Sequence, residues 1–300
     1  MFGIFKGRKN RRTQLSQEFR LSPEDKKFAE AFNRALIDER SMELNIVLKG
    51  QYARAYELLE NAVAAGLTPI LVGPPGVGKS LLARAFARDT GRTFYEVFFD
   101  ELMRPAYLIG TFDPAIVLQK GYCLEAFEPG PLLRAMIEGG VFVAQELNRA
   151  SEFCQNSLLE PLEERTYYVP RLGRIKAHDN FVLIATANPA ELAGTHRLSE
   201  ALRDRLRVWI QLVYPDRETE LEIIKVNLGG YSLSEDILHK ICNIVRLTRN
   251  NQYIEQPASI RAGISISRLV AQHAAAGYEI TDELIADCAR HVLRLSLIHI

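Results

Sequence analysis

Hydrophobic and polar positions follow two different patterns along the chain, and the change between them falls near residue 215. Before it, short apolar runs typical of buried strands alternate with segments of helical periodicity. The predicted strands cover 69–72, 93–99, 141–145, 181–186 and 208–212, and the helices between them cover 80–89, 131–138, 150–164 and 199–206. This alternation predicts an α/β fold in which helices sandwich a parallel sheet.

Strand-like runs end at Pro215, and the remaining residues predict an all-helical second domain. Its four helices are expected at 216–228, 234–249, 258–276 and 281–295, with Ser234 and Thr281 as candidate N-caps. Two more helices are expected before the first strand, one opening at Ser22 and Pro23 and one near 52–65. We therefore divide the chain into a basic flexible tail (1–22), an α/β core (23–215) and a helical lid (216–300).

Composition and charge narrow the class of protein. Lysine plus arginine and aspartate plus glutamate number 37 each, so no overall field draws the chain to nucleic acid or a membrane. No apolar stretch approaches the roughly 20 residues of a membrane span. Four cysteines without C-x-x-C spacing indicate reduced thiols with a structural role. These features predict a cytoplasmic protein.

The two ends of the chain carry their own expectations. Residues 1–13 are basic but lack the apolar core of a signal peptide. Phe2, Ile4 and Phe5 lie among these charges. Two alternatives therefore stay open: a solvated tail, or a tail that contacts a membrane surface or nucleic acid. The apolar residues 296–300 follow the last helix without a cap, which suggests a truncated lid or a foreign tail.

One segment carries specific chemistry, a match to G-x-x-x-x-G-K-[ST] between a predicted strand and a predicted helix. The nucleotide-binding residues expected there are Gly73, Pro74, Pro75, Gly76, Val77, Gly78, Lys79, Ser80 and Leu81. Glycines let backbone N–H groups turn inward around phosphate oxygens, and the start of the helix favours an anion. Lys79 supplies a positive charge for the phosphates and Ser80 a hydroxyl for Mg²⁺, so the chain is expected to bind a nucleoside triphosphate.

Four further polar positions lie where the loops of such a sheet meet its ligand. Glu146 ends an apolar run and could polarise the attacking water, although a solvated strand end reads the same way. Asn188 could orient that water or simply form an Asn-Pro turn. Arg205 follows a helix, with Arg203 as the alternative, and could be only a surface ion pair. Arg261 opens a lid helix and could be merely exposed.

Taken in order, several segments resemble the MoxR family of AAA+ ATPases, from about Val47 to Leu295. The similar segments are Val47 to Gln51 ("VGQ"), Gly110 to Leu132 ("GT…F.PGPL"), Gln145 to Ala150 ("DEINRA"), Leu158 to Arg165 ("LLEAMEER"), Tyr214 to Arg217 and Ala258 to Ala262 ("ASPRA"). The resemblance implies a β-hairpin inserted into the second core helix. It also implies a ring, usually a hexamer, with nucleotide between neighbouring subunits.

Roles for individual residues follow from the resemblance. It places Val47 beside the adenine, Asn188 at the first sensor, Arg205 at the arginine finger and Arg261 at the second sensor, with Arg268 as the alternative to Arg261. It also implies ATP and Mg²⁺ as cofactors. A partner with a von Willebrand factor A domain is implied as a separate chain, because no D-x-S-x-S motif occurs here.

One position departs from the family pattern in a way that matters. Gln145 stands where the family has the Walker B aspartate that holds Mg²⁺ through water. A neutral amide can still accept a hydrogen bond from a metal-bound water, but the loss of a charge-assisted bond costs about 1.5 to 3 kcal/mol. We therefore expect nucleotide binding to survive, while Mg²⁺ affinity and turnover fall.

Three functions remain in view from the sequence. The first is an ATP-hydrolysing ring motor of MoxR type that remodels or activates a partner protein complex like a chaperone. The second is an ATP-gated assembly scaffold in which Gln145 permits binding but little hydrolysis. The third, less favoured, is a motor that translocates nucleic acid. Lys120 in the inserted hairpin supports this function, and the balanced overall charge argues against it.

Overall fold

The computed structural model describes residues 45–189, 197–254 and 257–293. Contacts divide the chain into residues 1–42 and 43–300, and all the described residues belong to the second unit. The predicted tail, the helix expected to open at Pro23, and the end at 296–300 all lie outside the described residues. None of the described helices is both long and apolar enough to cross a membrane.

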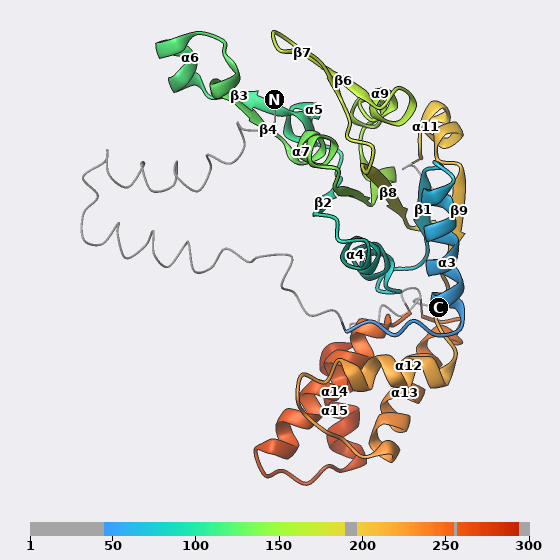
Figure 1. Ribbon diagram of the computed structural model, residues 1–300. Helices are drawn as coiled ribbons and strands as arrows, with labels where there is room; N and C mark the ends of the chain where they lie inside the picture. Colours follow the sequence, from blue (N-terminus) through green and yellow to red (C-terminus); the bar gives the residue numbers. More distant parts are fainter. Residues whose placement is uncertain (1–44, 190–196, 255–256, 294–300) are drawn as a thin grey trace, which may run out of the picture. The chain divides into compact units, whose positions relative to one another are not determined.

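A parallel sheet of five strands forms the centre of the unit, in the order β2-β5-β8-β1-β9. Its strands are β1 (Pro69–Val72), β2 (Phe94–Phe98), β5 (Val141–Gln145), β8 (Val182–Ala187) and β9 (Val208–Gln211). Every residue of β1, β5 and β8 is buried, as expected for strands covered on both faces (Figure 1). The predicted strands are therefore confirmed to within a residue or two at their ends.

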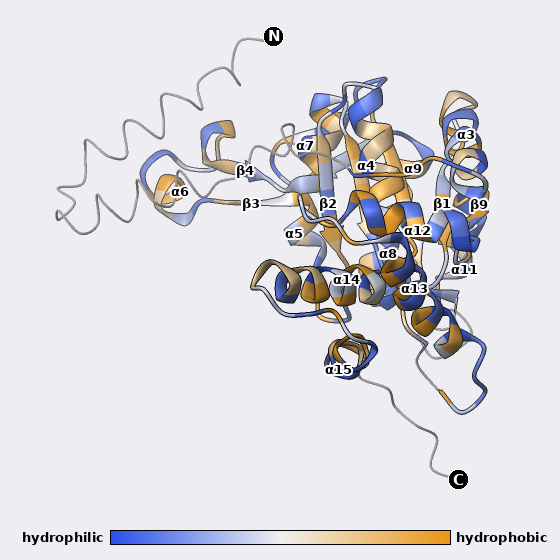
Figure 2. Cartoon of the chain, turned by 90° about the horizontal axis from the view of Figure 1, so that it is seen from below, coloured by the Kyte–Doolittle hydropathy of each residue, from blue (hydrophilic) through white to orange (hydrophobic). Residues whose placement is uncertain are grey.

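Helices cover both faces of this sheet. On one face, α3 (Gln51–Ala64) and α4 (Lys79–Asp89) pack Leu59, Leu82 and Phe86 against Leu71 and its neighbours. On the other face lie α5 (Pro105–Ile109), α7 (Pro131–Glu138), α8 (Glu152–Asn156), α9 (Leu159–Glu163) and α11 (Glu200–Arg205). Figure 2 shows the hydrophobic residues gathered along the sheet, between the helices.

The predicted insertion is present, and it is larger than a simple hairpin. Between α5 and α7, β3 (Gly110–Phe112) pairs antiparallel with β4 (Phe127–Pro129). The connection between these strands contains α6 (Pro114–Lys120) and a short 3-10 helix, η3 (Leu124–Ala126). In Figures 1 and 2, α6 lies at the outer end of the strand pair, away from the sheet. Lys120 is the last residue of α6.

One predicted helix is wrong, since 150–164 is not continuous. The chain forms η4 (Leu147–Arg149), then α8 and α9, with a break at residues 157 and 158. Pro161 has no N–H for the carbonyl of Ser157, as a continuous helix would require, but it is tolerated in the first turn of α9. A second antiparallel pair that the pattern did not indicate, β6 (Thr166–Val169) and β7 (Gly173–Lys176), follows.

The four lid helices occur close to their predicted positions. They are α12 (Arg217–Val226), α13 (Glu235–Arg249), α14 (Ile260–Ala275) and α15 (Asp282–Val292). The hydroxyl of Thr281 accepts from Leu284 N at 3.2 Å, which confirms this N-cap. Ser234 occupies the N-cap position of α13, but its side chain makes no capping hydrogen bond. These helices form two hydrophobic clusters of their own.

Candidate functional site

The phosphate loop connects the buried end of β1 to the start of α4. Gly78 is the N-cap of α4 with φ of 100°, a left-handed conformation that favours glycine. Gly76 has φ of 73°, and a Cβ on it would lie 2.8 Å from Ser259 of the lid. The loop therefore folds back between strand and helix while touching the second domain. This is the geometry that the sequence motif predicts.

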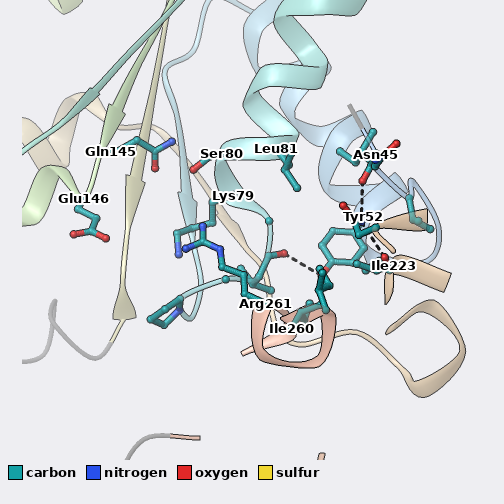
Figure 3. A pocket seen from close by; sticks show the side chains of 18 of the residues that line it. Asn45, Tyr52, Lys79, Ser80, Leu81, Gln145, Glu146, Ile223, Ile260 and Arg261 are labelled. Atoms are coloured by element: carbon teal, nitrogen blue, oxygen red, sulfur yellow. Dashed lines mark hydrogen bonds between the residues drawn. The ribbon is translucent and has the colours of Figure 1, made fainter. Parts of the chain in front are cut away.

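Lys79 lies inside this loop and is held by the loop itself. Its Nζ donates to the carbonyl oxygens of Gly73 at 2.6 Å and of Pro74 at 3.0 Å. An ammonium group in this position adds positive charge to a cradle of backbone N–H groups. Figure 3 shows Lys79 and Ser80 on the phosphate-loop side of a pocket, with Gln145 and Glu146 nearby.

This pocket brings together residues from the core and from the lid. It is lined by Asn45, Ile46, Val47, Tyr52, Pro75, Gly76, Val77, Gly78, Lys79, Ser80, Leu81, Phe98, Gln145, Glu146, Ile223, Asn227, Ile260, Arg261 and Ile264. One end is polar and contains the phosphate loop. The other is largely apolar and is formed by the segment around Val47 and by α12 and α14. A pocket of this composition suits a ligand with an anionic end and a flat apolar end.

Tyr52 of α3 holds the phosphate loop in place between the polar and the apolar end of the pocket. Its hydroxyl donates to Val77 O at 3.0 Å, and the side chain is buried. Burial raises the pKa of Tyr52 well above its usual value, and the nearby carboxylate of Glu220 acts in the same direction. The phenol therefore stays protonated as a hydrogen-bond donor to the phosphate loop. The sequence pattern did not single out Tyr52.

Gln145 ends β5 and Glu146 follows it, and both line the pocket. Gln145 is 2% exposed, accepts a hydrogen bond from Thr186 Oγ1 at 2.7 Å and donates to Glu96 at 2.9 Å. Glu146 has a left-handed backbone with φ of 53°, and its N–H donates to Thr186 Oγ1 at 3.1 Å. Its carboxylate pairs with Arg149 at 2.7 Å. The sequence did not predict Glu96 or Thr186 as hydrogen-bond partners of these two residues.

Asn188 and Arg205 do not line this pocket. Asn188 follows β8 directly, beside the loop, because Gly73 N donates to Ala187 O at 3.3 Å. Arg205 ends α11, pairs with Glu163 of α9 and with Asp204 at 2.7 Å, and so lies on another part of the surface. The alternative, Arg203, is exposed.

The two lid arginines differ in position. Arg261, in the first turn of α14, lines the pocket. Arg268 instead donates through Nε to Asn227 O at 2.7 Å. Figure 3 shows Arg261 extending toward Lys79 from the lid. Of these two arginines, Arg261 lines the pocket and Arg268 does not.

A buried ion cluster supports the lid beside the pocket. Glu220 is fully buried and receives hydrogen bonds from Arg249 at 2.6 and 2.9 Å and from Arg246 at 3.2 Å. Arg249 also donates to Ala258 O at 2.8 Å, just before α14. A buried carboxylate needs such partners, because an unpaired one is costly. The sequence reading missed this cluster, since its members are 26 and 29 residues apart.

Cysteine and metal chemistry add little to the site. Cys154, Cys242 and Cys288 are buried and Cys123 is half-buried, all as free thiols. Within the described ranges, no group of three or more His, Cys, Asp or Glu side chains is arranged to hold a metal ion.

Comparison with known proteins places this geometry among characterised families. A family model described as an AAA domain of the dynein-related subfamily matches residues 69–206. The chaperone MoxR1 of Mycobacterium tuberculosis is 33% identical over 189 residues, which cover 63% of this chain and 47% of MoxR1. The gas vesicle ATPase GvpN of Ancylobacter aquaticus is 31% identical over 222 residues, covering 66% of this chain and 59% of GvpN. The chain thus spans about half to three fifths of these relatives.

One further relative matches most of the chain, and two solved structures share its fold. The protein YeaC of Bacillus subtilis is 25% identical over 297 residues, which cover 91% of this chain and 85% of YeaC. A Thermotoga maritima RuvB mutant has a TM-score of 0.55 at 19% identity, covering 81% of this chain and 70% of RuvB. NtrX from Brucella abortus gives 0.56 at 16% identity, covering 87% of this chain and 57% of NtrX. These two likenesses concern the fold alone.

Proposed function

Since the chain belongs to the MoxR family of AAA+ ATPases, we propose that it binds and hydrolyses ATP in a ring and uses the energy to remodel or activate a partner protein complex. The observation that carries this proposal is the shared pocket, in which the phosphate loop and Arg261 of the lid face the same space. Relatives named as a chaperone and as an ATPase support it.

ATP binding rests on the two ends of the pocket. The triphosphate would lie against the backbone N–H groups of the loop and the ammonium of Lys79. The base would lie between Val47, Ile223 and Ile264, which supply apolar contact. Arg261 would then contact the phosphates from the lid. A bound nucleotide would thus place negative charge between the core and the lid and attract Arg261 toward the phosphate loop.

Mg²⁺ fits this site with the residues present. The hydroxyl of Ser80 and the amide oxygen of Gln145 are neutral oxygens at the pocket wall. The amide oxygen accepts one hydrogen bond from Thr186, which leaves its second lone pair available. When bound, Mg²⁺ neutralises the charge that develops on the transferred phosphoryl group.

Hydrolysis would use Glu146 to polarise water, with Asn188 to orient it and Arg205 supplied by a neighbouring copy. Before that step the carboxylate of Glu146 must part from Arg149, to which it is bonded here. The position of Arg205 supports the proposal of a ring, because Arg205 lies outside the pocket of its own chain and would have to act on that of a neighbour. A partner with a von Willebrand factor A domain, on a separate chain, is part of the same proposal.

The second candidate is an ATP-gated assembly scaffold with little turnover. The observation that favours it is Gln145, which is neutral and hydrogen-bonded at both ends of its amide. Phosphate release at saturating ATP separates the two functions, with sedimentation used to follow assembly. A ring that forms with ATP and releases phosphate no faster than its Lys79→Ala variant is a scaffold.

The experiment that tests the proposed ATPase activity compares the parent protein with three variants by ATP binding and phosphate release. Lys79→Ala removes a charge-assisted contact, so ATP affinity should fall at least tenfold. Glu146→Gln should keep ATP affinity and lower turnover roughly 10² to 10⁴-fold, the usual contribution of a general base. Glu152→Gln, an exposed carboxylate of α8, is the matched control. Parent protein that binds no ATP overturns the proposal.

A further inference from the structure

A continuous chain of hydrogen bonds crosses three strands beside the phosphate loop. Arg84 of α4 donates to Glu96 of β2 at 2.9 Å, and Gln145 Nε2 donates to the other oxygen of Glu96 at 2.9 Å. Thr186 donates to Gln145 Oε1 at 2.7 Å and accepts from the backbone N–H of Glu146 at 3.1 Å. Every donor along this chain points toward the carboxylate of Glu96.

The direction of these bonds determines which way the amide of Gln145 faces. Thr186 Oγ1 accepts from Glu146 N–H, so its single hydroxyl proton is the one donated to Gln145. The amide must therefore present oxygen to Thr186 and nitrogen to Glu96, whose carboxylate only accepts when ionised. A carboxylate at position 145 would satisfy Thr186 but would have nothing to donate to Glu96.

The strands hold these side chains together. Phe98 pairs with Gln145, which places Glu96 two residues away along β2 and on the same face. Ala144 pairs with Ala185, which sets Gln145 beside Thr186. The Arg84 and Glu96 side chains are 21% and 16% exposed, so their charges are only partly screened by solvent.

We propose that Glu96 carries the negative charge at the metal end of the site, and that Gln145 is the neutral residue this placement requires. Arg84 pairs with the carboxylate of Glu96 and fixes it in place. Gln145 is then a positioning residue, because its amide joins Glu96 to Thr186 and so to the backbone of Glu146. The part of this proposal that concerns the metal rests on the proposed ATP-binding function.

A carboxylate at position 145 is expected to harm this site unless position 96 changes with it. Restoring an acid there alone would place two carboxylates at hydrogen-bond distance, where like charges repel. The change that should succeed is an exchange, in which the acid moves to position 145 and the amide moves to position 96. Glu and Gln have the same shape, so Gln145→Glu combined with Glu96→Gln preserves packing while moving one charge.

The first measurement is the thermal unfolding midpoint of the parent, the two single variants and the double variant, without nucleotide or Mg²⁺. Gln145→Glu should lower the midpoint by roughly 5 °C or more. Glu96→Gln should also lower the midpoint, because its amide has one oxygen for two donors and its nitrogen then faces Arg84 or the amide nitrogen of Gln145. The double variant should recover most of the loss. A Gln145→Glu protein as stable as the parent, or a double variant whose loss is the sum of both, overturns the pairing.

The second measurement is ADP affinity with and without Mg²⁺ in the same proteins. Glu96→Gln should lower the gain in affinity that Mg²⁺ gives by roughly tenfold, the effect of about one charge-assisted hydrogen bond. The double variant should restore it, and Mg²⁺-free affinity should stay within about twofold throughout. Glu101→Gln, an exposed neighbour, is the control.

The two measurements separate the possible failures. An unchanged Mg²⁺ gain in Glu96→Gln means that the chain of bonds is only structural, which overturns the role of Glu96 at the metal. Parent protein that binds no ADP under either condition overturns the proposed nucleotide function. The unfolding midpoints still decide whether Gln145 and Glu96 are a matched pair, because they are measured without any ligand.

Discussion

Arg249 lies over the ring of Tyr214, with 3.8 Å between the guanidinium carbon and the ring centroid. The hydroxyl of Tyr214 donates to Pro75 O in the phosphate loop at 3.2 Å. On its other side Arg249 binds Glu220 and Ala258 O, just before the helix that carries Arg261. One lid arginine therefore contacts both Tyr214, which reaches the phosphate loop, and the segment just before the helix that carries Arg261.

We expect Arg249→Met to destabilise the protein by about 3 kcal/mol, because it leaves the buried carboxylate of Glu220 with Arg246 as its remaining ion-pair partner among the described residues. Chemical denaturation measures this change. Arg174→Met, which breaks an ion pair with half-exposed partners, should alter the free energy of unfolding by no more than about 1 kcal/mol. Equal effects of the two variants would contradict the assigned importance of the cluster.

Thr186→Val keeps the shape of the side chain and removes the hydroxyl between Gln145 and Glu146. Two groups then lose a partner, so we expect a loss of about 2 kcal/mol in the free energy of unfolding. Thr186→Ser retains the hydroxyl and should lose less than half as much. If the serine variant is as unstable as the valine variant, packing and not hydrogen bonding explains the effect.

Arg205→Ala should keep ATP binding and lower turnover at least 10³-fold, the usual lower limit for an arginine supplied to phosphoryl transfer by a partner. Mixing it with Glu146→Gln tests whether the arginine acts between copies. The first variant retains an intact pocket and the second retains the arginine, so mixed rings should regain turnover that neither has alone. A mixture that exchanges subunits and stays inactive contradicts action between copies.

Arg203→Ala is the matched control for this experiment, since Arg203 is exposed two residues before Arg205. We expect its turnover to remain within about twofold of the parent, as for most surface substitutions. A large loss in Arg203→Ala with none in Arg205→Ala would move the assignment to Arg203.

Thiol chemistry gives a prediction with a defined pH range. Burial raises the pKa of Cys154 to about 11 and that of Cys242 to about 11. At pH 8 Ellman's reagent should therefore react quickly with the half-buried Cys123 alone, and Cys123→Ser should remove that reaction. Because the folded state holds these two thiol protons more tightly, the stability they contribute is complete below pH 9 and is lost as pH rises to 11. Rapid labelling of two or more thiols at pH 8 would contradict this.

The sheet and the phosphate loop could be predicted because their signals are local. Each buried strand is a short apolar run, and the loop is one segment whose glycines and Lys79 have a single known use. The broken helix after Glu146 was missed although Pro161 signalled it. The β6–β7 pair was missed because its strands are half-exposed and alternate only weakly.

The contacts around Gln145 lay beyond any reading of the sequence. Glu96 is 49 residues away, and its bond to Gln145 depends on the register of two strands that pair side by side. The departure at position 145 was visible as a missing charge. The structure gives the amide two partners, and this changes which experiment is informative.

Gly76 has a mechanical consequence for the joint between core and lid. A Cβ added at Gly76 would lie 2.8 Å from Ser259, the residue just before α14, so glycine allows the phosphate loop to approach the lid this closely. Even the single methyl group of an alanine at position 76 would therefore push the phosphate loop and the lid apart.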